Sequence, residues 1–282
     1  MSGRHARPLP VPEAVERSFL PSVEALRTLQ RVDVPDPEAV HRARTSARRL
    51  RSNVRVLDAE SEPVASLRAE LGWIGECLGT VRDVDVLTAR VTAAARAVPE
   101  PLELGAAAVL ATLAEERGSG DEHLRAAVSS ARFRDLVDEL DLLLKEAASS
   151  PDSLDARDVM RPPWRAMRDA VRGLDDSPSD EQLHDLRIEA KRARYAAGLF
   201  SSVAGKRAAR FVKRATTLQD TLGAQHDAVR ACTWFLAHGG EDTGLARTCG
   251  WFAAQAAAER DALRITWRPA WKALRDPKAR FW

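Results

Sequence analysis

The most informative stretch of this chain is Val40-His41-Arg42-Ala43-Arg44-Thr45-Ser46-Ala47-Arg48-Arg49-Leu50-Arg51-Ser52-Asn53-Val54-Arg55-Val56-Leu57. It contains one histidine, six arginines and no acidic residue. On a helix, residues three and four apart share a side, so one narrow stripe of about 21 Å collects His41, Arg44, Arg48, Arg51 and Arg55. A different side collects Ala43, Ala47, Leu50, Val54 and Leu57. The stretch therefore predicts an amphipathic helix with a purely cationic stripe.

Such a stripe has two interpretations. Like charges at this spacing destabilise a helix by a few tenths of a kcal/mol per pair, and nothing within the stretch offsets the repulsion. The stripe is either a solvated face that forms ion pairs with neighbouring helices, or a binding surface for an extended anion. Arginine suits phosphate because its planar guanidinium donates two hydrogen bonds at once. A row of guanidinium groups one helical turn apart matches a linear polyanion better than a compact one.

The same pattern occurs again around His184. His41 matches His184, Arg44 matches Arg187, Arg48 matches Lys191, Arg49 matches Arg192 and Arg51 matches Arg194, each with an offset of 143. A second block, Leu78-Gly79-Thr80-Val81-Arg82-Asp83-Val84, aligns with Leu222-Gly223-Ala224-Gln225-His226-Asp227-Ala228 at an offset of 144. Two ordered blocks at nearly constant separation predict an internal duplication, with two similar halves related by an approximate twofold axis.

The repeated set of a histidine- and arginine-bearing helix followed by a Leu-Gly-x-x-Arg/His-Asp segment resembles the conserved-histidine α-helical domain, CHAD. The resemblance runs from about Glu13 to about Asp276. It implies an all-α fold of two four-helix bundles around a basic central pore, and binding of inorganic polyphosphate. Association with polyphosphate granules is implied by the resemblance alone.

Low aromatic content and an abundance of Ala, Arg, Leu and Glu favour helix over sheet, and no strand or hairpin pattern stands out. We expect a tail over 1–12, a first half over 13–148, a linker over 149–158, a second half over 159–276 and a tail over 277–282. Helices are expected over 13–31 with a bend near Pro21, then 36–57, 63–96, 106–117, 121–148, 159–173, 180–203, 205–237 and 243–275. Gly118-Ser119-Gly120 is interpreted as a helix break.

The formal net charge is only +2, so the chain is not uniformly basic as many nucleic-acid-binding proteins are. The three cysteines, Cys77, Cys232 and Cys249, lack C-x-x-C spacing and suggest buried free thiols in a reducing compartment. The start of the chain lacks the pattern of a signal peptide, and no stretch is long and apolar enough to span a membrane. We therefore expect a cytoplasmic protein. The sequence does not indicate an oligomeric state.

The expected polyphosphate site combines the two stripes with the cationic positions of the second block and of the following helix. Arg82 and His226 would add positive charge at the pore mouth. Asp83 and Asp227 would either fix neighbouring arginines or serve as ordinary ion-pair or helix-start residues. The proposed ligand-binding residues are His41, Arg44, Arg48, Arg51, Arg55, Arg82, His184, Arg187, Lys191, Arg194, Arg210, Lys213 and His226.

The symmetry between the halves is incomplete. A basic patch at Lys206, Arg207, Arg210, Lys213 and Arg214 has no counterpart in the first half, and Gly198 stands where the first half has Arg55. Either the anion extends toward the second half, or this patch is a solvated surface; both interpretations remain open from sequence.

The motif histidines could bind a metal, accept phosphate, donate a hydrogen bond to an anion, or serve a structural role. Metal sites need several clustered ligands, whereas the neighbours of His41 are arginines, so we expect no metal and no cofactor. A nearby polyanion would favour the protonated imidazole, which suits the donor role.

The sequence patterns are compatible with three functions. The first is binding of polyphosphate without catalysis. The second is a phosphohydrolase or phosphotransferase, which needs metal-holding carboxylates or a nucleophile with a base; the carboxylates near the motifs are single, and no Gly-rich phosphate loop is present. The third is RNA or DNA binding, which needs interleaved aromatic residues; Tyr195 is the one candidate, which argues against nucleic acid. The sequence therefore favours polyphosphate binding without catalysis.

Overall fold

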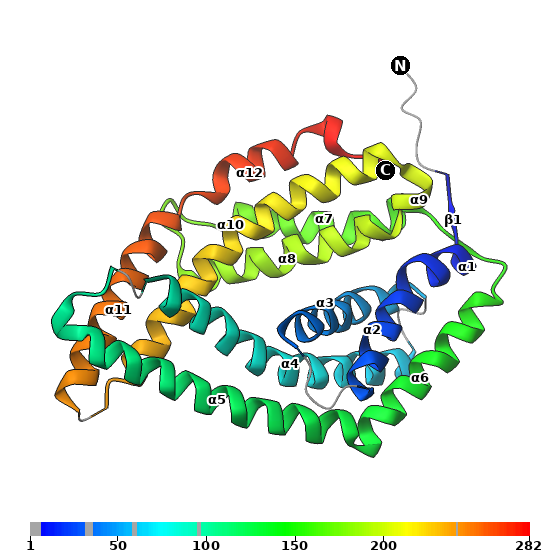
Figure 1. Ribbon diagram of the computed structural model, residues 1–282. Helices are drawn as coiled ribbons and strands as arrows, with labels where there is room; N and C mark the ends of the chain where they lie inside the picture. Colours follow the sequence, from blue (N-terminus) through cyan, green and yellow to red (C-terminus); the bar gives the residue numbers. More distant parts are fainter. Residues whose placement is uncertain (1–6, 32–35, 58–60, 95–96, 241) are drawn as a thin grey trace. The chain divides into compact units, whose positions relative to one another are not determined.

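The computed structural model describes residues 7–31, 36–57, 61–94, 97–240 and 242–282, and these residues are mostly helical (Figure 1). The all-α fold class is therefore confirmed. In chain order the elements are β1 (Leu9–Pro10), α1 (Val11–Ala14), the π-helix η1 (Val15–Phe19), α2 (Leu20–Gln30), α3 (Pro37–Asn53), the 3₁₀ turn η2 (Val54–Val56), α4 (Glu62–Ala94), η4 (Glu100–Leu102), α5 (Glu103–Ser129), α6 (Ala131–Ala148), β2 (Ser153–Leu154), α7 (Ala156–Arg172), α8 (Asp180–Leu199), α9 (Ser201–Ala204), α10 (Lys206–Ala237), α11 (Thr243–Leu263), α12 (Trp267–Leu274) and η5 (Pro277–Ala279). No described helix is both long and apolar enough to cross a lipid bilayer.

The described chain forms two compact units whose boundaries differ from those of the expected halves. Unit 1 comprises the described residues up to Ser18 together with Glu146–Arg230 and Ala256–Trp282; unit 2 comprises Phe19–Lys145 and Ala231–Gln255. Residues 231–255 join unit 2 because they pack against α5 and the turn before it. The indole Nε1 of Trp234 donates to Glu116 at 3.1 Å, and the hydroxyl of Thr248 donates to the carbonyl of Leu102 at 3.3 Å. The internal duplication stays a prediction.

The helix starts predicted for the two basic helices are confirmed. The Asp36 carboxylate accepts a hydrogen bond from the Ala39 amide at 2.6 Å, and Pro37 occupies the first helical position of α3. The α8 helix begins with a capping box in which Ser179 and Gln182 each accept a hydrogen bond from the other's backbone amide. Both basic helices therefore begin where the local sequence specifies.

The expected helix break at Gly118-Ser119-Gly120 is wrong, because α5 continues through these residues to Ser129. Gly120 faces α4, where a Cβ atom added to it would lie 3.3 Å from a methyl group of Val81. This glycine therefore serves a close approach of α5 to α4, and that packing offsets its low helix propensity. The helix ends instead before Ser130. The Ser130 hydroxyl caps α6 by accepting a hydrogen bond from the Phe133 amide at 3.1 Å.

Several helix boundaries near prolines differ from those expected. Near Pro21, where a bend is expected, the π-helix η1 immediately precedes α2. In unit 1, α7 begins at Ala156 under the cap of Asp155, three residues before the expected start, and Pro162 and Pro163 lie inside the helix. The region 243–275, expected as one helix, is divided into α11, which ends at Leu263, and α12, which begins at Trp267.

The described ends of the chain depart from the expected tails. Leu9 and Pro10 pair antiparallel with Leu154 and Ser153, inside the segment expected as a linker. Leu9 is fully buried, and Phe281 near the other end is 2% exposed. Both ends are therefore held in unit 1 by burial of apolar side chains. Residues 1–6 of the expected tail lie outside the described residues.

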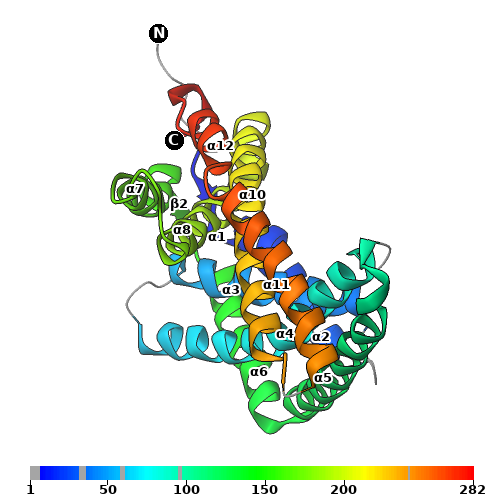
Figure 2. The same ribbon diagram turned by 90° about the vertical axis from the view of Figure 1, so that its left-hand side faces the viewer.

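The core of unit 1 lies among α7, α8, α10 and α12. Figure 2 shows α7 beside α8, and both views show α12 along α10. Phe200, Phe211 and Phe281 are at most 2% exposed, and the ring centroids of Phe200 and Phe281 lie 6.0 Å apart. Trp267 and Trp271 are buried, whereas Trp234 and Trp251 of unit 2 are half-buried. The three cysteines are free thiols, and Cys77 is half-buried while the other two are buried.

Candidate anion-binding site

In unit 2 the cationic stripe lies on α3, and the apolar side of the helix is buried as predicted. Ala43, Ala47, Leu50 and Val54 are at most 1% exposed. On the stripe, His41 and Arg51 are exposed, while Arg44 and Arg48 are half-buried. Arg55 lies on the 3₁₀ turn η2, because α3 ends at Asn53 and not near Leu57.

Two arginines of this stripe lie over glycines of α4. A Cβ atom on Gly79 would lie 3.6 Å from a terminal nitrogen of Arg44, and one on Gly72 would lie 3.0 Å from Cζ of Arg51. Arg44 Nη1 also donates a hydrogen bond to a carboxylate oxygen of Asp83, which lies on α4 as Gly79 does; the two atoms are 3.0 Å apart. The glycines therefore leave room for the guanidinium groups between α3 and α4. Gly79 lies within the repeated block, whereas Gly72 lies outside it and was not singled out from the sequence.

His41 lies in a strongly cationic environment. Partial burial lowers its pKa, and the positive charges of Arg82, Arg48 and Arg44 lower it further, while Glu38 opposes them. The charge of Arg82 on α4 therefore acts on His41, while its expected place at a pore mouth stays a prediction. Because its neighbours disfavour the imidazolium, His41 is predominantly neutral at neutral pH.

In unit 1 the second stripe lies on α8, which runs antiparallel to α10. Arg187 lies over Gly223, where a Cβ atom would be 3.8 Å from the arginine Nε. This contact repeats the one between Arg44 and Gly79 in unit 2. The same pair of residue types, arginine on the basic helix and glycine on the long helix, therefore makes the same kind of contact in both units.

His184 and His226 face each other in unit 1. Their Nδ1 atoms lie 3.2 Å apart, and their ring centroids are separated by 4.6 Å. Burial lowers the pKa of His226 to about 3, with further lowering by the charges of Arg187, His184, Arg230 and Lys191. Burial also lowers the pKa of His184, again followed by the charge of Arg187. Both rings are therefore neutral at neutral pH, and one Nδ1–H donates to the other.

Arg230 is a member of this cluster that the sequence reasoning missed. Its charge contributes to the lowered pKa of both histidines. The available signal was its position four residues after His226, which places both on one side of α10. The alignment of the two halves concealed it, because the residue in register with Arg230 in the first half is Val86.

Arg194 continues the second stripe beyond Lys191. Its guanidinium carbon lies 4.5 Å from the ring centroid of Tyr195, and its buried Nε has no hydrogen-bond partner among the described residues. Tyr195 itself is 5% exposed. The one aromatic residue within the motifs is therefore covered, and its ring is not an open stacking surface.

The structure does not bring Arg210 and Lys213 to the histidine pair. Lys213 precedes His226 by a length of α10 of about 20 Å. Arg210 and Lys213 are exposed, as are Lys206 and Arg207. Arg214 points to the C-terminal region, where it donates to the carbonyl of Ala273 at 2.8 Å. The patch thus stays a candidate both for an extension of the anion-binding surface and for an ordinary solvated surface.

The acidic residues of the motifs bear on whether the site could hold a metal ion. Asp83 forms the ion pair with Arg44 described above, which is the ion-pair role considered from sequence. Within the described ranges, no three side chains of the types His, Cys, Asp and Glu come together in a way that could hold a metal ion. What the arrangement can do chemically is surround an anion with guanidinium, ammonium and imidazole donors.

Comparison with known proteins identifies the family of this chain. The family model described as CHAD domain matches residues 23–236. The chain belongs to the CHAD family. The resemblance of the repeated motifs is thereby confirmed.

Solved structures share this CHAD fold. The crystal structure of the CHAD domain from the plant Ricinus communis matches with a TM-score of 0.80 and 23% identity, covering 97% of this chain and 94% of that one. PptA from Streptomyces chartreusis matches with a TM-score of 0.74 and 21% identity, covering 93% of this chain and 99% of that one. At these identities the likeness establishes the fold.

Curated relatives are longer than this chain. Uncharacterized protein Rv2226 from Mycobacterium tuberculosis is 29% identical over 239 residues, which cover 79% of this chain and 45% of the relative. Uncharacterized protein MT2285 from another strain of the same species matches equally well. The chain thus spans about half the length of the curated relatives it matches.

Proposed function

We propose that this CHAD chain binds inorganic polyphosphate through the cationic stripes of α3 and α8 and the facing residues of α4 and α10. Polyphosphate binding is part of the known character of the family. The observation that carries the proposal is the repeated placement of a stripe arginine over a glycine of the long helix, Arg44 over Gly79 and Arg187 over Gly223. After burial, the positive charges of these arginines also contribute to the lowered pKa of the motif histidines.

A polyphosphate chain supplies the missing negative charge. Its phosphates repeat along a line, as the guanidinium groups repeat about every 5.4 Å along a helix. Binding lowers the repulsion among the stripe residues, and it favours protonation of the histidines, which then donate to phosphate oxygens. The expectation that one chain occupies both stripes in a common pore remains a prediction.

We further propose that the site binds polyphosphate without cleaving it. The motif carboxylates are single, and Asp83 is engaged with Arg44. Phosphoryl transfer requires an arrangement that positions a nucleophile and stabilises the transferred group. Orthophosphate release from long-chain polyphosphate, measured with and without Mg²⁺, tests this part; release above the uncatalysed rate would establish the enzyme alternative.

The deciding experiment is charge reversal on both stripes. Arg48→Glu combined with Lys191→Glu is expected to abolish binding of long-chain polyphosphate while the helical circular dichroism stays unchanged. The matched control is Arg42→Glu with Arg192→Glu. It makes the same charge change on the same two helices, at exposed residues that pair with Glu38 and Glu189 away from the stripes. Unchanged affinity in the stripe variant, or equal loss in the control, contradicts the proposal.

Two further measurements characterise the interaction. Affinity is expected to fall steeply with salt, with a slope of about 0.7 per phosphate contact on logarithmic axes by analogy with single-stranded nucleic acids. Polyphosphate is expected to raise the melting temperature, because it binds the folded chain in preference to the unfolded one. Competition by single-stranded RNA at physiological salt separates polyphosphate binding from nucleic-acid binding, which the covered ring of Tyr195 disfavours.

A further inference from the structure

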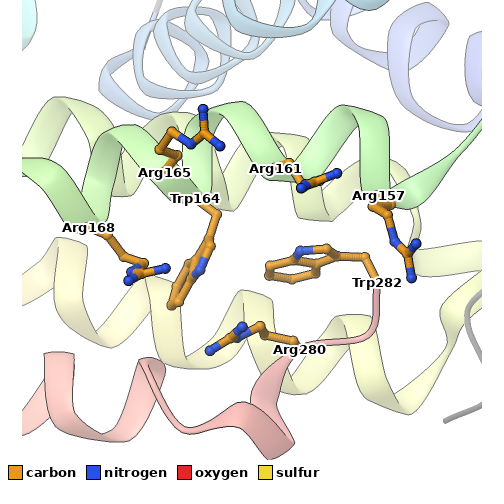
Figure 3. Close-up of a pocket in the computed structure, with 7 residues that line it drawn as sticks. All are labelled: Arg157, Arg161, Trp164, Arg165, Arg168, Arg280 and Trp282. Carbon is orange, nitrogen blue, oxygen red and sulfur yellow. The ribbon is translucent and has the colours of Figure 1, made fainter.

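A second cationic surface lies in unit 1 on α7, outside the repeated motifs. A pocket of about 410 Å³ is lined by Arg157, Arg161, Trp164, Arg165, Arg168, Arg280 and Trp282 (Figure 3). Five of these lining residues come from α7 and two from the segment that follows η5. None of the lining residues is acidic, so the wall of this pocket is cationic and aromatic.

The arginines of α7 recur at helical spacing. Arg157, Arg161 and Arg168 share a side of the helix with Trp164, because they are three, four and seven residues apart. Arg161 and Arg165 are exposed and Arg168 is half-buried, and none of the three has a carboxylate partner among the described residues. Figure 3 shows Arg168 and Arg280 beside the ring of Trp164, and Arg157 and Arg161 beside the ring of Trp282.

The two indole rings give the pocket a fixed floor. Trp164 is 5% exposed, and its ring lies 5.9 Å from that of Trp282 in an edge-to-face arrangement. The guanidinium of Arg280 lies 5.2 Å from the ring centroid of Trp164. Trp164 also packs against Phe211 and Trp271 of the unit 1 core. The lining is thus anchored in the core and is not a set of loose surface side chains.

A second observation points independently to a ligand. The indole Nε1–H of Trp164 is buried and has no hydrogen-bond acceptor among the described residues. Buried donors in native proteins are normally satisfied, so an unmatched N–H in the wall of a cationic pocket calls for an acceptor from outside the chain. The surrounding guanidinium groups favour an anion as the source of this acceptor.

We propose that this pocket binds a compact ligand with two or three linked phosphates, either inorganic or as the phosphate tail of a nucleotide. Guanidinium groups about 10 Å apart along α7, from Arg161 to Arg168, span several phosphate groups. The volume lies in the range of small-molecule pockets, which suits a short ligand. The indole N–H donates to a phosphate oxygen. This site is separate from the stripes and does not depend on their proposed function.

The test uses the full chain carrying Arg48→Glu and Lys191→Glu, so that the stripes do not obscure the second site. Pyrophosphate, tripolyphosphate, ATP and AMP are titrated calorimetrically at low salt. We expect saturable binding of tripolyphosphate near one equivalent, weakened about tenfold or more by adding Arg161→Gln with Arg168→Gln. The matched control adds Arg172→Gln with Arg275→Gln, which removes two exposed arginines of the same unit outside the pocket and leaves affinity within about twofold.

A conservative variant keeps the proposal testable if the double substitution disturbs folding. Trp164→Phe retains a buried ring but removes the N–H, and it is expected to lower tripolyphosphate affinity several-fold. Because the smaller ring also costs core packing, the melting temperature of this variant is measured without ligand, and its affinity is measured well below that temperature. If ATP and tripolyphosphate bind with equal affinity, the pocket recognises the phosphates alone. If ATP binds much more tightly than tripolyphosphate and AMP binding is also detectable, the ligand is a nucleotide. Absence of saturable binding, equal loss in the control pair, or binding of single-stranded RNA alone overturns the proposal. Failure here leaves the long-chain binding assay of the stripes unaffected.

Discussion

The two motif sites share a contact and differ in what surrounds it. In unit 2, Arg44 lies over Gly79 and pairs with Asp83, and Arg82 is the residue of the long helix near His41. In unit 1, Arg187 lies over Gly223, and the corresponding residue of the long helix is His226, which contacts His184. One site therefore holds a permanent charge where the other holds a group that gains charge by protonation. The comparison predicts that they bind the same anion with different dependence on pH.

The largest expected effect comes from reversing one arginine in each site. Arg44→Glu and Arg187→Glu should each lower polyphosphate affinity about tenfold or more at pH 8, because each removes a cation and adds an anion. At pH 6 the loss from Arg187→Glu should be smaller, since replacing Arg187 by a carboxylate raises the pKa of His184 and His226, although burial, the first cause of their lowered pKa values, remains. The loss from Arg44→Glu should change less with pH. Equal pH dependence of the two variants would contradict the distinction between the sites.

The next effect is the pH dependence of binding in the unsubstituted chain. The pKa of His226 is about 3 without ligand, so a bound polyanion that raises this pKa causes proton uptake. Affinity should therefore increase as the pH falls from 8 to 6, and His184→Asn with His226→Gln should flatten the increase. Calorimetry in buffers of different ionisation enthalpy measures the protons directly. His41→Asn is the comparison in unit 2 and should flatten the profile less, since it removes one titrating group and not two.

The same histidines make the ligand-free protein sensitive to acid. Because the folded-state pKa of His226 lies below its usual value near 6.5, the unfolded chain binds more protons between pH 6.5 and 3. The free energy of unfolding should therefore decrease as the pH falls below about 6.5. Urea denaturation at pH 7 and pH 5.5 should show a smaller decrease for His226→Gln than for the unsubstituted chain. An unchanged or larger decrease would show that the pair does not resist protonation.

The smallest expected effects concern the glycines under the arginines. A Cβ atom at Gly79 or Gly223 would make an ordinary contact, so Gly79→Ala and Gly223→Ala should each stabilise the chain by up to about 0.5–1 kcal/mol through helix propensity. Gly72→Ala should stabilise the chain less than the other two substitutions. It should also weaken polyphosphate binding, because the added Cβ atom would displace the Arg51 guanidinium. Thermal unfolding and a binding assay of the three variants provide the measurement. Opposite signs for Gly79→Ala and Gly223→Ala would show that the two contacts are not equivalent.

Much of the stripe geometry could be predicted from the sequence because it depends on local rules. The caps at Asp36 and Ser179 follow from side-chain hydrogen bonding to the first amides of a helix. The burial of Ala43 and Leu50 follows from helical periodicity. The repeat also singled out Arg82 as a cationic position, and its charge contributes to the lowered pKa of His41.

The remainder depended on contacts between segments distant in sequence. Gly120 reads locally as a helix breaker, and only its approach to Val81 explains why α5 continues. Arg230 has no counterpart in the repeat, so aligning the halves hid it. The assignment of residues 231–255 to unit 2 depends on contacts such as that of Trp234 with Glu116, which no local pattern encodes.

The pairing of Leu9 and Pro10 with Ser153 and Leu154 has a practical consequence for expressing parts of this protein. A chain truncated to begin at residue 13 loses a fully buried leucine and leaves the edge formed by residues 153–154 without its partner strand. Separately produced fragments covering 13–148 and 159–276 lack both strands. Such fragments are therefore poor substitutes for the intact polypeptide, and low solubility in them would report on missing sequence and not on ligand requirement.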